Sequence, residues 1–252
     1  MTNEIFHFSP LLYSLPPPPP LLVTKQAPLS DITFKAASFD WVQDTVAATT
    51  RWGDLGDWDV SGVGDFTRAF CECRTADGSH TNGANLKAAT FVGTGMSKWI
   101  TTSLTKMEWT FRGAAAMNAD LTSWSVVKVT TMEGAFSSAN KFAGKGLDSW
   151  ITSSIAGTAL HFTFSTAREM NADLSGWNVA KVKTFLNLFD GAAKFTGTGL
   201  YKWRVPEATD MKDMFRSTVL TSCNKRKIAD AWKGNNAFKY TSAWAGETCT
   251  VR

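Results

Sequence analysis

The apolar residues of this chain recur along its length with a nearly constant period. A tryptophan occupies the same position in each period, and successive ones lie 41, 25, 26, 27 and 26 residues apart. The first interval therefore holds one period plus an insert. Self-similarity at a fixed spacing of this size is typical of proteins built from stacked repeats. The tryptophans that define the repeat are Trp58, Trp99, Trp124, Trp150, Trp177 and Trp203.

Each repeat also carries other apolar residues at fixed distances from its tryptophan. A leucine or methionine precedes the tryptophan by three positions, and a valine or threonine follows it by two. A phenylalanine follows by twelve, except in the fourth repeat, which has two extra residues before it. From the second repeat to the sixth, these are Phe111, Phe136, Phe164, Phe189 and Phe215. Because large aromatic side chains dominate core energetics, we expect both columns to form a layered core and not a cofactor site.

The segments around the tryptophans match the strand signature of leucine-rich repeats. LTSWSV, LSGWNV and LYKWRV each read L-x-x-L-x-L, with tryptophan in the second apolar place. Apolar residues two apart share one face of a strand, whereas spacings of three and four in residues 127–139 indicate a short helical return. We therefore predict an α/β repeat fold. This is a leucine-rich-repeat-like solenoid of about six coils, each with a short parallel strand and a short helix or 3₁₀ return.

The domain organisation follows from the need to cover the ends of such a stack. One coil alone buries too little apolar surface to offset the entropy of ordering it, so coils must stack and the terminal coils need caps. We predict helical caps at both ends: residues 30–50 read as an N-terminal capping helix, and 217–252 as a C-terminal cap. The repeats fill 51–216, with an insert at about 74–90. Residues 1–29 form a proline-rich leader that we expect to be disordered; alternatively, Pro16 to Pro20 dock in an SH3-like or WW-like groove.

Composition and charge exclude several classes of function. The net charge is +4 and the basic residues are scattered, whereas nucleic-acid binding needs a clustered basic surface. No apolar run reaches the roughly 18 residues that a membrane span requires, and no basic secretory leader is evident. The three histidines lie far apart, in the leader, the insert and a coil. We predict a non-enzymatic protein without cofactor or metal.

The four cysteines form two local pairs. If coils stack at about 4.8 Å, Cys71 and Cys73 lie too far from the C-terminal cysteines to bond with them in a monomer. Cys223 and Cys249 are a candidate disulfide that would close the C-terminal cap, the alternative being free buried thiols. Cys71 and Cys73 could form half of a metal site with His80, but these are too few ligands for a closed site. The state of that pair stays open.

Two stretches of the repeat carry a family resemblance. NADLTSWSVVKVTTMEGAF (118–136) and NADLSGWNVAKVKTFLNLF (171–189) resemble the repeat of the bacterial-surface-protein-A-like family of leucine-rich-repeat surface proteins. The resemblance recurs from copy to copy over roughly residues 31–250. It implies a leucine-rich-repeat solenoid, secreted or at the cell surface, that is used for adhesion or protein binding.

These observations favour a protein-binding or adhesion module that acts as a monomer on a protein or cell-surface ligand. In a strand, the residue after each tryptophan faces away from the core, so these positions would form one continuous surface. Exposed isoleucines on that surface would indicate protein contact. The alternative is a structural surface array or an ice-binding type of solenoid, although the position three after each tryptophan lacks the uniform threonine of an ice-binding ladder. The candidate binding face consists of Asp59, Ile100, Ser125, Ile151, Asn178 and Arg204.

Overall fold

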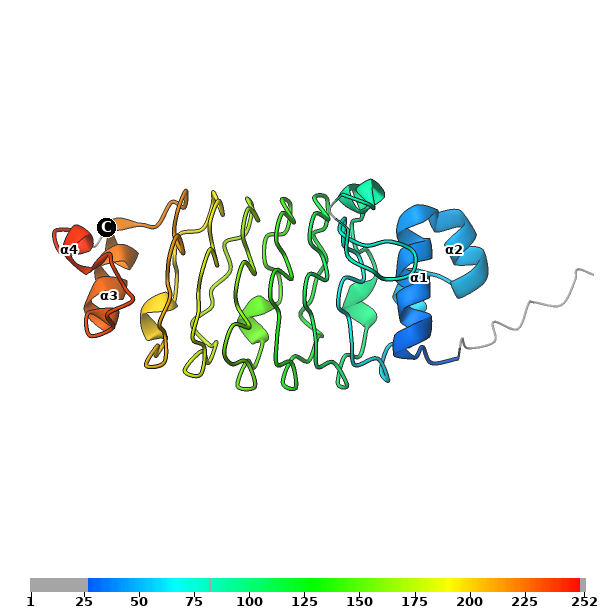
Figure 1. Cartoon of the computed structure of the whole chain (residues 1–252), viewed down its shortest axis with the longest axis horizontal. Coiled ribbons are helices and arrows are strands. Elements are labelled where there is room, and N and C mark those ends of the chain that lie inside the picture. The colour runs from blue at the N-terminus through cyan, green and yellow to red at the C-terminus, as the bar shows by residue number, and fades with distance from the viewer. Residues whose placement is uncertain (1–26, 82, 250–252) are drawn as a thin grey trace, which may run out of the picture.

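The computed structural model describes residues 27–81 and 83–249. The chain forms an elongated stack of coils with a pair of helices at each end (Figure 1). The N-terminal pair is α1 (Asp31–Gln43) and α2 (Thr45–Trp52), and the C-terminal pair is α3 (Ser222–Trp232) and α4 (Thr241–Trp244). Short 3₁₀ helices lie between them: η1 (Leu55–Asp57), η2 (Leu86–Thr90), η3 (Met96–Lys98), η4 (Leu147–Ser149) and η5 (Leu200–Lys202).

The described residues contain isolated β-bridges but no strand, so the prediction of an α/β leucine-rich-repeat-like solenoid is wrong. The tryptophans that follow η1, η3, η4 and η5 do have extended backbone angles, as in Trp99 with φ −73° and ψ 137°. At this place, however, side chains connect neighbouring coils. The indole Nε1 of Trp99 donates to the Leu55 carbonyl at 2.8 Å, and Thr101 both donates to the Ser125 carbonyl and accepts from its N–H. These bonds replace the backbone ladder that a sheet requires.

The predicted helical return is also wrong, because the segment after each tryptophan is a run of tight turns. The N–H groups of Phe66, Arg68 and Phe70 donate to carbonyls of the next coil at 2.8–3.0 Å. In a helix these groups would bond within their own segment instead. Every second residue can point to the neighbouring coil because residues with a left-handed conformation recur along this segment. One such position is present in every coil and is occupied by Arg68, Trp109, Gly134, Phe162, Asn187 and Asp213.

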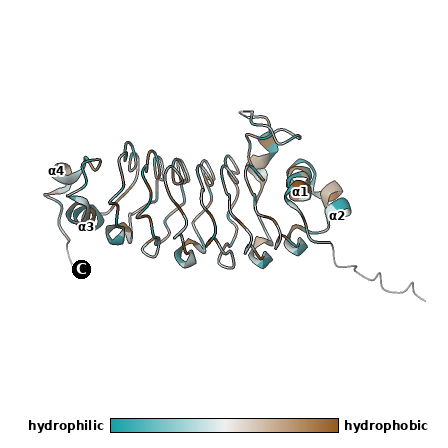
Figure 2. Cartoon of the chain, turned by 60° about the horizontal axis from the view of Figure 1, so that its bottom comes forward, coloured by the Kyte–Doolittle hydropathy of each residue, from teal (hydrophilic) through white to brown (hydrophobic). Residues whose placement is uncertain are grey.

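The core consists of two aromatic columns that run along the stack. Tryptophan rings of adjacent coils are nearly parallel, for example Trp99 and Trp124 with centroids 5.8 Å apart. The phenylalanines stack in the same way, with Phe136 5.5 Å from Phe164. The eleven aromatic residues expected to form the layered core are all buried. Hydrophobic segments accordingly recur at equivalent places in successive coils (Figure 2).

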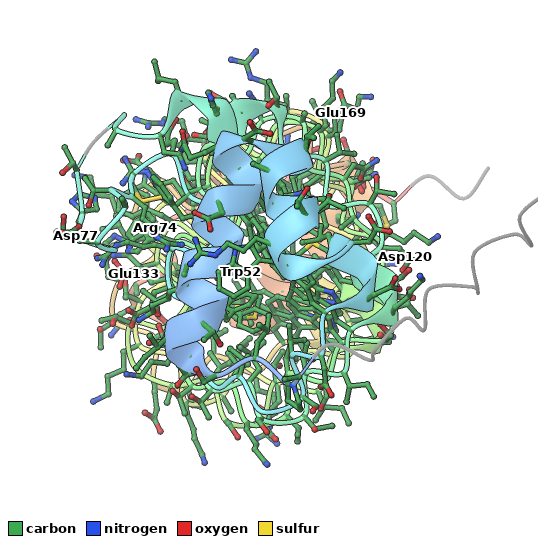
Figure 3. All side chains as sticks on the ribbon, turned by 90° about the vertical axis from the view of Figure 1, so that its right-hand side faces the viewer. Trp52, Arg74, Asp77, Asp120, Glu133 and Glu169 are labelled. Carbon is green, nitrogen blue, oxygen red and sulfur yellow. A yellow bond between two sulfur atoms is a disulfide. The ribbon has the colours of Figure 1, made fainter. Side chains whose placement is uncertain are left out.

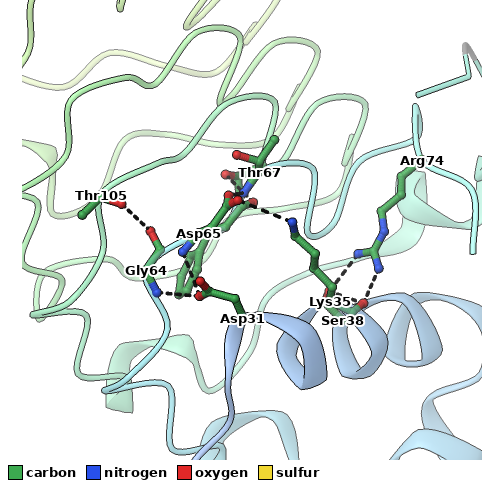
Figure 4. Close-up of polar contacts among 10 residues, drawn as sticks. Asp31, Lys35, Ser38, Gly64, Asp65, Thr67, Arg74 and Thr105 are labelled. Carbon is green, nitrogen blue, oxygen red and sulfur yellow. Dashed lines mark hydrogen bonds and ion pairs between the residues drawn. The ribbon is translucent and has the colours of Figure 1, made fainter. Parts of the chain in front are cut away.

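Helix α1 covers the first coil. Its Phe34 is fully buried and stacks on Phe66 at 4.4 Å, so the helix supplies the layer that a preceding coil would have supplied. Helix α1 also supplies a hydrogen-bond acceptor to the first coil. The backbone N–H groups of Gly64 and Asp65 donate to the Asp31 carboxylate at 2.7 and 3.1 Å (Figure 4). The end-on view shows α1 and α2 lying across this end (Figure 3).

A buried arginine joins the insert to the N-terminal cap. Arg74 donates to the Ser38 hydroxyl at 3.0 Å and to the Lys35 carbonyl (Figure 4). It also donates to the Ala69 carbonyl, and its guanidinium lies over the Phe39 ring. Burial lowers the pKa of Arg74 to about 10. The side chain therefore stays protonated at neutral pH and keeps all of these bonds.

Helix α3 covers the other end by continuing the tryptophan column. Its Trp232 stacks 6.4 Å from Trp203 and donates its indole N–H to the Trp203 carbonyl at 3.1 Å. Ile228 and Ala229 are buried beside it. Both ends of the stack are thus closed by helices, and no helix in 27–81 or 83–249 is long and apolar enough to cross a membrane.

Candidate functional site

The candidate face predicted from the sequence is exposed in part. Ile100 and Ile151 are 61% and 63% exposed, although they are large and apolar. Val127, which the candidate face did not include, lies on the coil between them and is 42% exposed. The three residues follow the tryptophans of three successive coils, and we call them the aliphatic patch. The patch therefore concentrates in the second to fourth coils.

The other members of the predicted face are polar and add little to this patch. Asn178 and Arg204 are exposed, on the fifth and sixth coils. Asp59 is half-buried and accepts hydrogen bonds from the Ser61 N–H and hydroxyl at 3.1 and 2.6 Å. Ser125 is half-buried with its backbone bonded to Thr101. The exposed apolar members of the face therefore lie on the second and fourth coils, and its exposed polar members lie on the fifth and sixth.

A second surface feature lies on the tight-turn side of the coils. Trp109 of the second coil and Phe162 of the fourth coil have ring centroids 6.3 Å apart, with the third coil between them. The third coil has Gly134 at this position, and a Cβ there would overlap the Trp109 ring. Because Gly134 has no side chain, the indole of Trp109 can occupy the space beside it. The rings of Trp109 and Phe162 together form a flat aromatic surface, which we call the platform.

Polar side chains surround a hollow of about 430 Å³ beside these rings. The Arg112 guanidinium lies 5.1 Å from the centre of the Trp109 ring, and its Nε is 3.9 Å from a carboxylate oxygen of Glu72. On the other side, the hydroxyls of Ser138 and Thr166 are hydrogen-bonded to each other at 2.9 Å. The hollow therefore combines a flat apolar surface, a carboxylate, a guanidinium group and hydroxyl groups.

Both aromatic residues have a backbone conformation that is unusual for bulky side chains. Trp109 has φ 56° and Phe162 has φ 55°, in the left-handed region that disfavours residues with a Cβ. The backbone hydrogen bonds to the next coil impose this conformation at every equivalent position. The side chain there points outward, so the core does not require an aromatic residue. Sequence reasoning missed this site, although Trp109 is a tryptophan outside the repeating column.

His161 packs against its own turn. Its ring stacks on that of Phe162 with centroids 4.1 Å apart, and its Nδ1 lies 3.6 Å from a carboxylate oxygen of Glu133. The imidazole thus supports Phe162 from behind. This arrangement places His161 as a positioning residue of the platform.

Another cleft, of about 800 Å³, lies between the sixth coil and the C-terminal cap. It is lined by Asp210, Asp213, Lys239 and Tyr240, among others. Burial, together with the nearby Asp213, raises the pKa of Tyr240. The phenol therefore stays neutral and available as a hydrogen-bond donor.

Four acidic residues of the described surface lie on two opposite sides of the stack (Figure 3). Viewed along the stack, Asp120 and Glu169 lie on the opposite side from Asp77 and Glu133 (Figure 3). Hydrogen bonds from Lys145 and Thr122 lower the pKa of Asp120 to about 2. Glu169 pairs with a lysine of the next coil. These carboxylates hold turns in place, and none is paired with a second carboxylate for acid–base chemistry.

The cysteines form two disulfides. The candidate pair Cys223 and Cys249 is bonded, with Cα atoms 4.2 Å apart, and joins α3 to the tail of the chain. Cys71 and Cys73 are bonded to each other, so neither offers a thiolate to a metal with His80. Within the described residues no three potential ligands gather into a metal site.

The comparisons with known proteins identify the family. A family model described as "Mycoplasma protein of unknown function, DUF285" matches residues 40–158 and, in a second overlapping match, residues 105–232. The chain belongs to this family. The resemblance to the bacterial-surface-protein-A-like family of leucine-rich-repeat surface proteins is therefore wrong as an assignment, because the matching model is that of DUF285. No curated protein and no solved structure matches this DUF285 chain.

Proposed function

We propose that this DUF285 protein is a binding module that contacts another protein through the aliphatic patch, and that it acts by binding and not by catalysis. The observation that carries the proposal is the exposure of Ile100, Val127 and Ile151 on three successive coils. Contiguous apolar surface on a soluble domain commonly marks a protein contact. The stack shape supports it, because stacked repeats offer extended surfaces to large partners.

The patch has no structural role that accounts for it. The core is already filled by the aromatic columns, and these three side chains point outward from it. The exposed parts of these aliphatic side chains contribute nothing to the packing of the core and lower solubility. A partner that covers them would remove this apolar surface from water, which is favourable by about 25 cal/mol per Å².

Two further expectations belong to this proposal. Disulfides form and persist in oxidising compartments, so the two cysteine pairs support a secreted or cell-surface location. The helices that close both ends hinder end-to-end association of copies. We therefore infer that the module meets a protein or cell-surface ligand as a monomer.

The experiment compares partner capture by the full chain and by the variant Ile100→Lys/Ile151→Lys. Proteins captured in a pull-down are quantified by mass spectrometry, and each candidate is then purified and measured directly with both baits. Because buried apolar side chains at the centre of an interface dominate its energy, we expect the variant to bind roughly tenfold more weakly or worse.

A matched control exists on the N-terminal cap. Ile32 and Val46 are 82% and 77% exposed, so Ile32→Lys/Val46→Lys makes the same chemical change at a distance from the patch. This control should bind as the unmodified chain does. Equal binding by both double variants and the unmodified chain would refute the proposed contact surface.

A further inference from the structure

We propose that the hollow beside Trp109 and Phe162 is a binding site for a neutral saccharide. The site lies on the tight-turn side of the coils and is independent of the aliphatic patch. The proposal rests on the groups that lie together there: two aromatic rings, a carboxylate beside a guanidinium, and hydroxyl groups from two coils.

The rings suit the C–H face of a sugar. Both rings are held in place by their neighbours: the indole lies against Gly134 with the Arg112 guanidinium 5.1 Å from its ring centre, and the phenyl ring stacks on His161. A ligand therefore meets surfaces that are already ordered, which reduces the entropy lost on binding. Their remaining exposed atoms line the hollow.

The polar groups suit a ligand with many hydroxyls. A sugar presents vicinal hydroxyls, each of which donates and accepts. Arg112 can donate to one hydroxyl while Glu72, 3.9 Å from it, accepts from its neighbour. The linked hydroxyls of Ser138 and Thr166 can do both.

Charge and shape disfavour the other ligands that aromatic and cationic residues attract. Glu72 offsets the charge of Arg112, so a phosphate or sulfate that approached the Arg112 guanidinium would also meet a carboxylate. A proline-rich peptide needs an elongated groove, because its extended helix rises about 3.1 Å per residue. The hollow of about 430 Å³ is bordered by polar side chains and lies within the size range typical of small-ligand sites.

The backbone supports the same conclusion. Trp109 and Phe162 have left-handed backbone angles, which strain any residue with a side chain. Other coils place polar residues there, Asn187 and Asp213 among them. Two bulky aromatic residues at strained, outward-facing positions on either side of a glycine are explained by a ligand that they contact.

The test applies the full chain to an array of neutral and anionic oligosaccharides, and measures each hit by calorimetry. We expect binding to one or more neutral glycans. Trp109→Ala and Phe162→Ala should each weaken it roughly tenfold or more, and Trp109→Phe should retain part of it. A circular dichroism spectrum equal to that of the unmodified chain shows that a variant has folded.

Two controls make the result specific. Tyr201 is another half-buried aromatic residue with a cation over its ring, Lys227 at 5.0 Å, so Tyr201→Ala should leave glycan binding unchanged. The variant Ile100→Lys/Ile151→Lys should also bind glycans normally, which separates this site from the protein contact. Absence of any neutral glycan among the hits would overturn the proposal. So would neutral-glycan binding that survives Trp109→Ala, or Trp109-dependent binding restricted to anionic glycans or a proline-rich peptide.

Discussion

Single residues with left-handed backbone angles set the geometry of the tight-turn side. At Gly134 this conformation has φ 58° and the absent Cβ leaves room for the Trp109 ring. At Gly157 the angle is nearly the same, φ 62°, but no other atom lies within 4 Å of the position that a Cβ would take. The two glycines therefore separate the cost of the backbone from the cost of displacing the indole.

Replacing Gly134 with alanine should destabilise the protein more than the same change at Gly157. Gly157→Ala adds only the left-handed strain, roughly 1–2 kcal/mol. Gly134→Ala adds a similar strain and also displaces the Trp109 ring, which should lower the free energy of unfolding by about 1–3 kcal/mol more. Urea unfolding of both variants measures the difference. Equal losses of unfolding free energy in the two variants would contradict the position of the Trp109 ring against Gly134.

At this scale the sequence predicts inward-facing residues well and outward-facing ones poorly. Burial requires similar apolar residues at equivalent positions of each coil, so the repetition of Trp124 and Phe136 along the chain predicts that they are buried. Trp109 makes a contact that the other coils do not make, so no tryptophan recurs at its position. The repeat pattern therefore does not predict its role. Ile100 and Ile151 could be found because they stand next to a repeating residue. Val127, two positions further from its tryptophan, could not.

Secondary structure is less predictable here, because two different backbones produce the same residue pattern. Side chains two apart point to one side in any extended segment, whether or not a sheet forms, so Trp177 and Val179 fit a strand that is absent. Likewise, tandem turns repeat inward positions at spacings of three and four, as a helix does. What decides the outcome is where the backbone hydrogen bonds go, and the apolar pattern does not report that.

The C-terminal cap is the element with the clearest covalent support. The Cys223–Cys249 disulfide spans 26 residues, and closing a loop of that size stabilises the folded state by about 3 kcal/mol. Cys223→Ala/Cys249→Ala should therefore speed amide exchange in α3 and α4, measured by hydrogen–deuterium exchange with mass spectrometry. The middle coils should keep their protection, because they contact only their neighbours.

The second disulfide provides the control for this prediction. Cys71 and Cys73 are two residues apart, and their link lies in the first coil. Cys71→Ala/Cys73→Ala should change exchange in that coil and not in α3. If the variant without Cys223 and Cys249 exchanged faster along the whole stack instead, the cap would not be an independent unit.

The molecule as a whole is close to one-dimensional, which sets how damage spreads through it. Each coil packs on the coil before and the coil after, and the aromatic columns are the contacts that they share (Figure 1). In such stacks the stability is roughly the sum of the coils and the interfaces between them. A terminal coil can open together with its cap by breaking one interface with the rest of the stack, whereas a middle coil cannot open without breaking two interfaces.

The same substitution should therefore act differently at the end and in the middle of the stack. Phe136 stacks on Phe111 and Phe164 at 5.5 Å, whereas Phe215 lies on the last coil against Phe189 and the cap. Each change to alanine removes contacts worth about 3–5 kcal/mol. Phe215→Ala should increase amide exchange only in the sixth coil and the C-terminal cap, through local opening. Phe136→Ala should lower protection in the second, third and fourth coils together and reduce the urea midpoint. A uniform loss of protection from both variants would show a globular core in which all coils unfold as one unit.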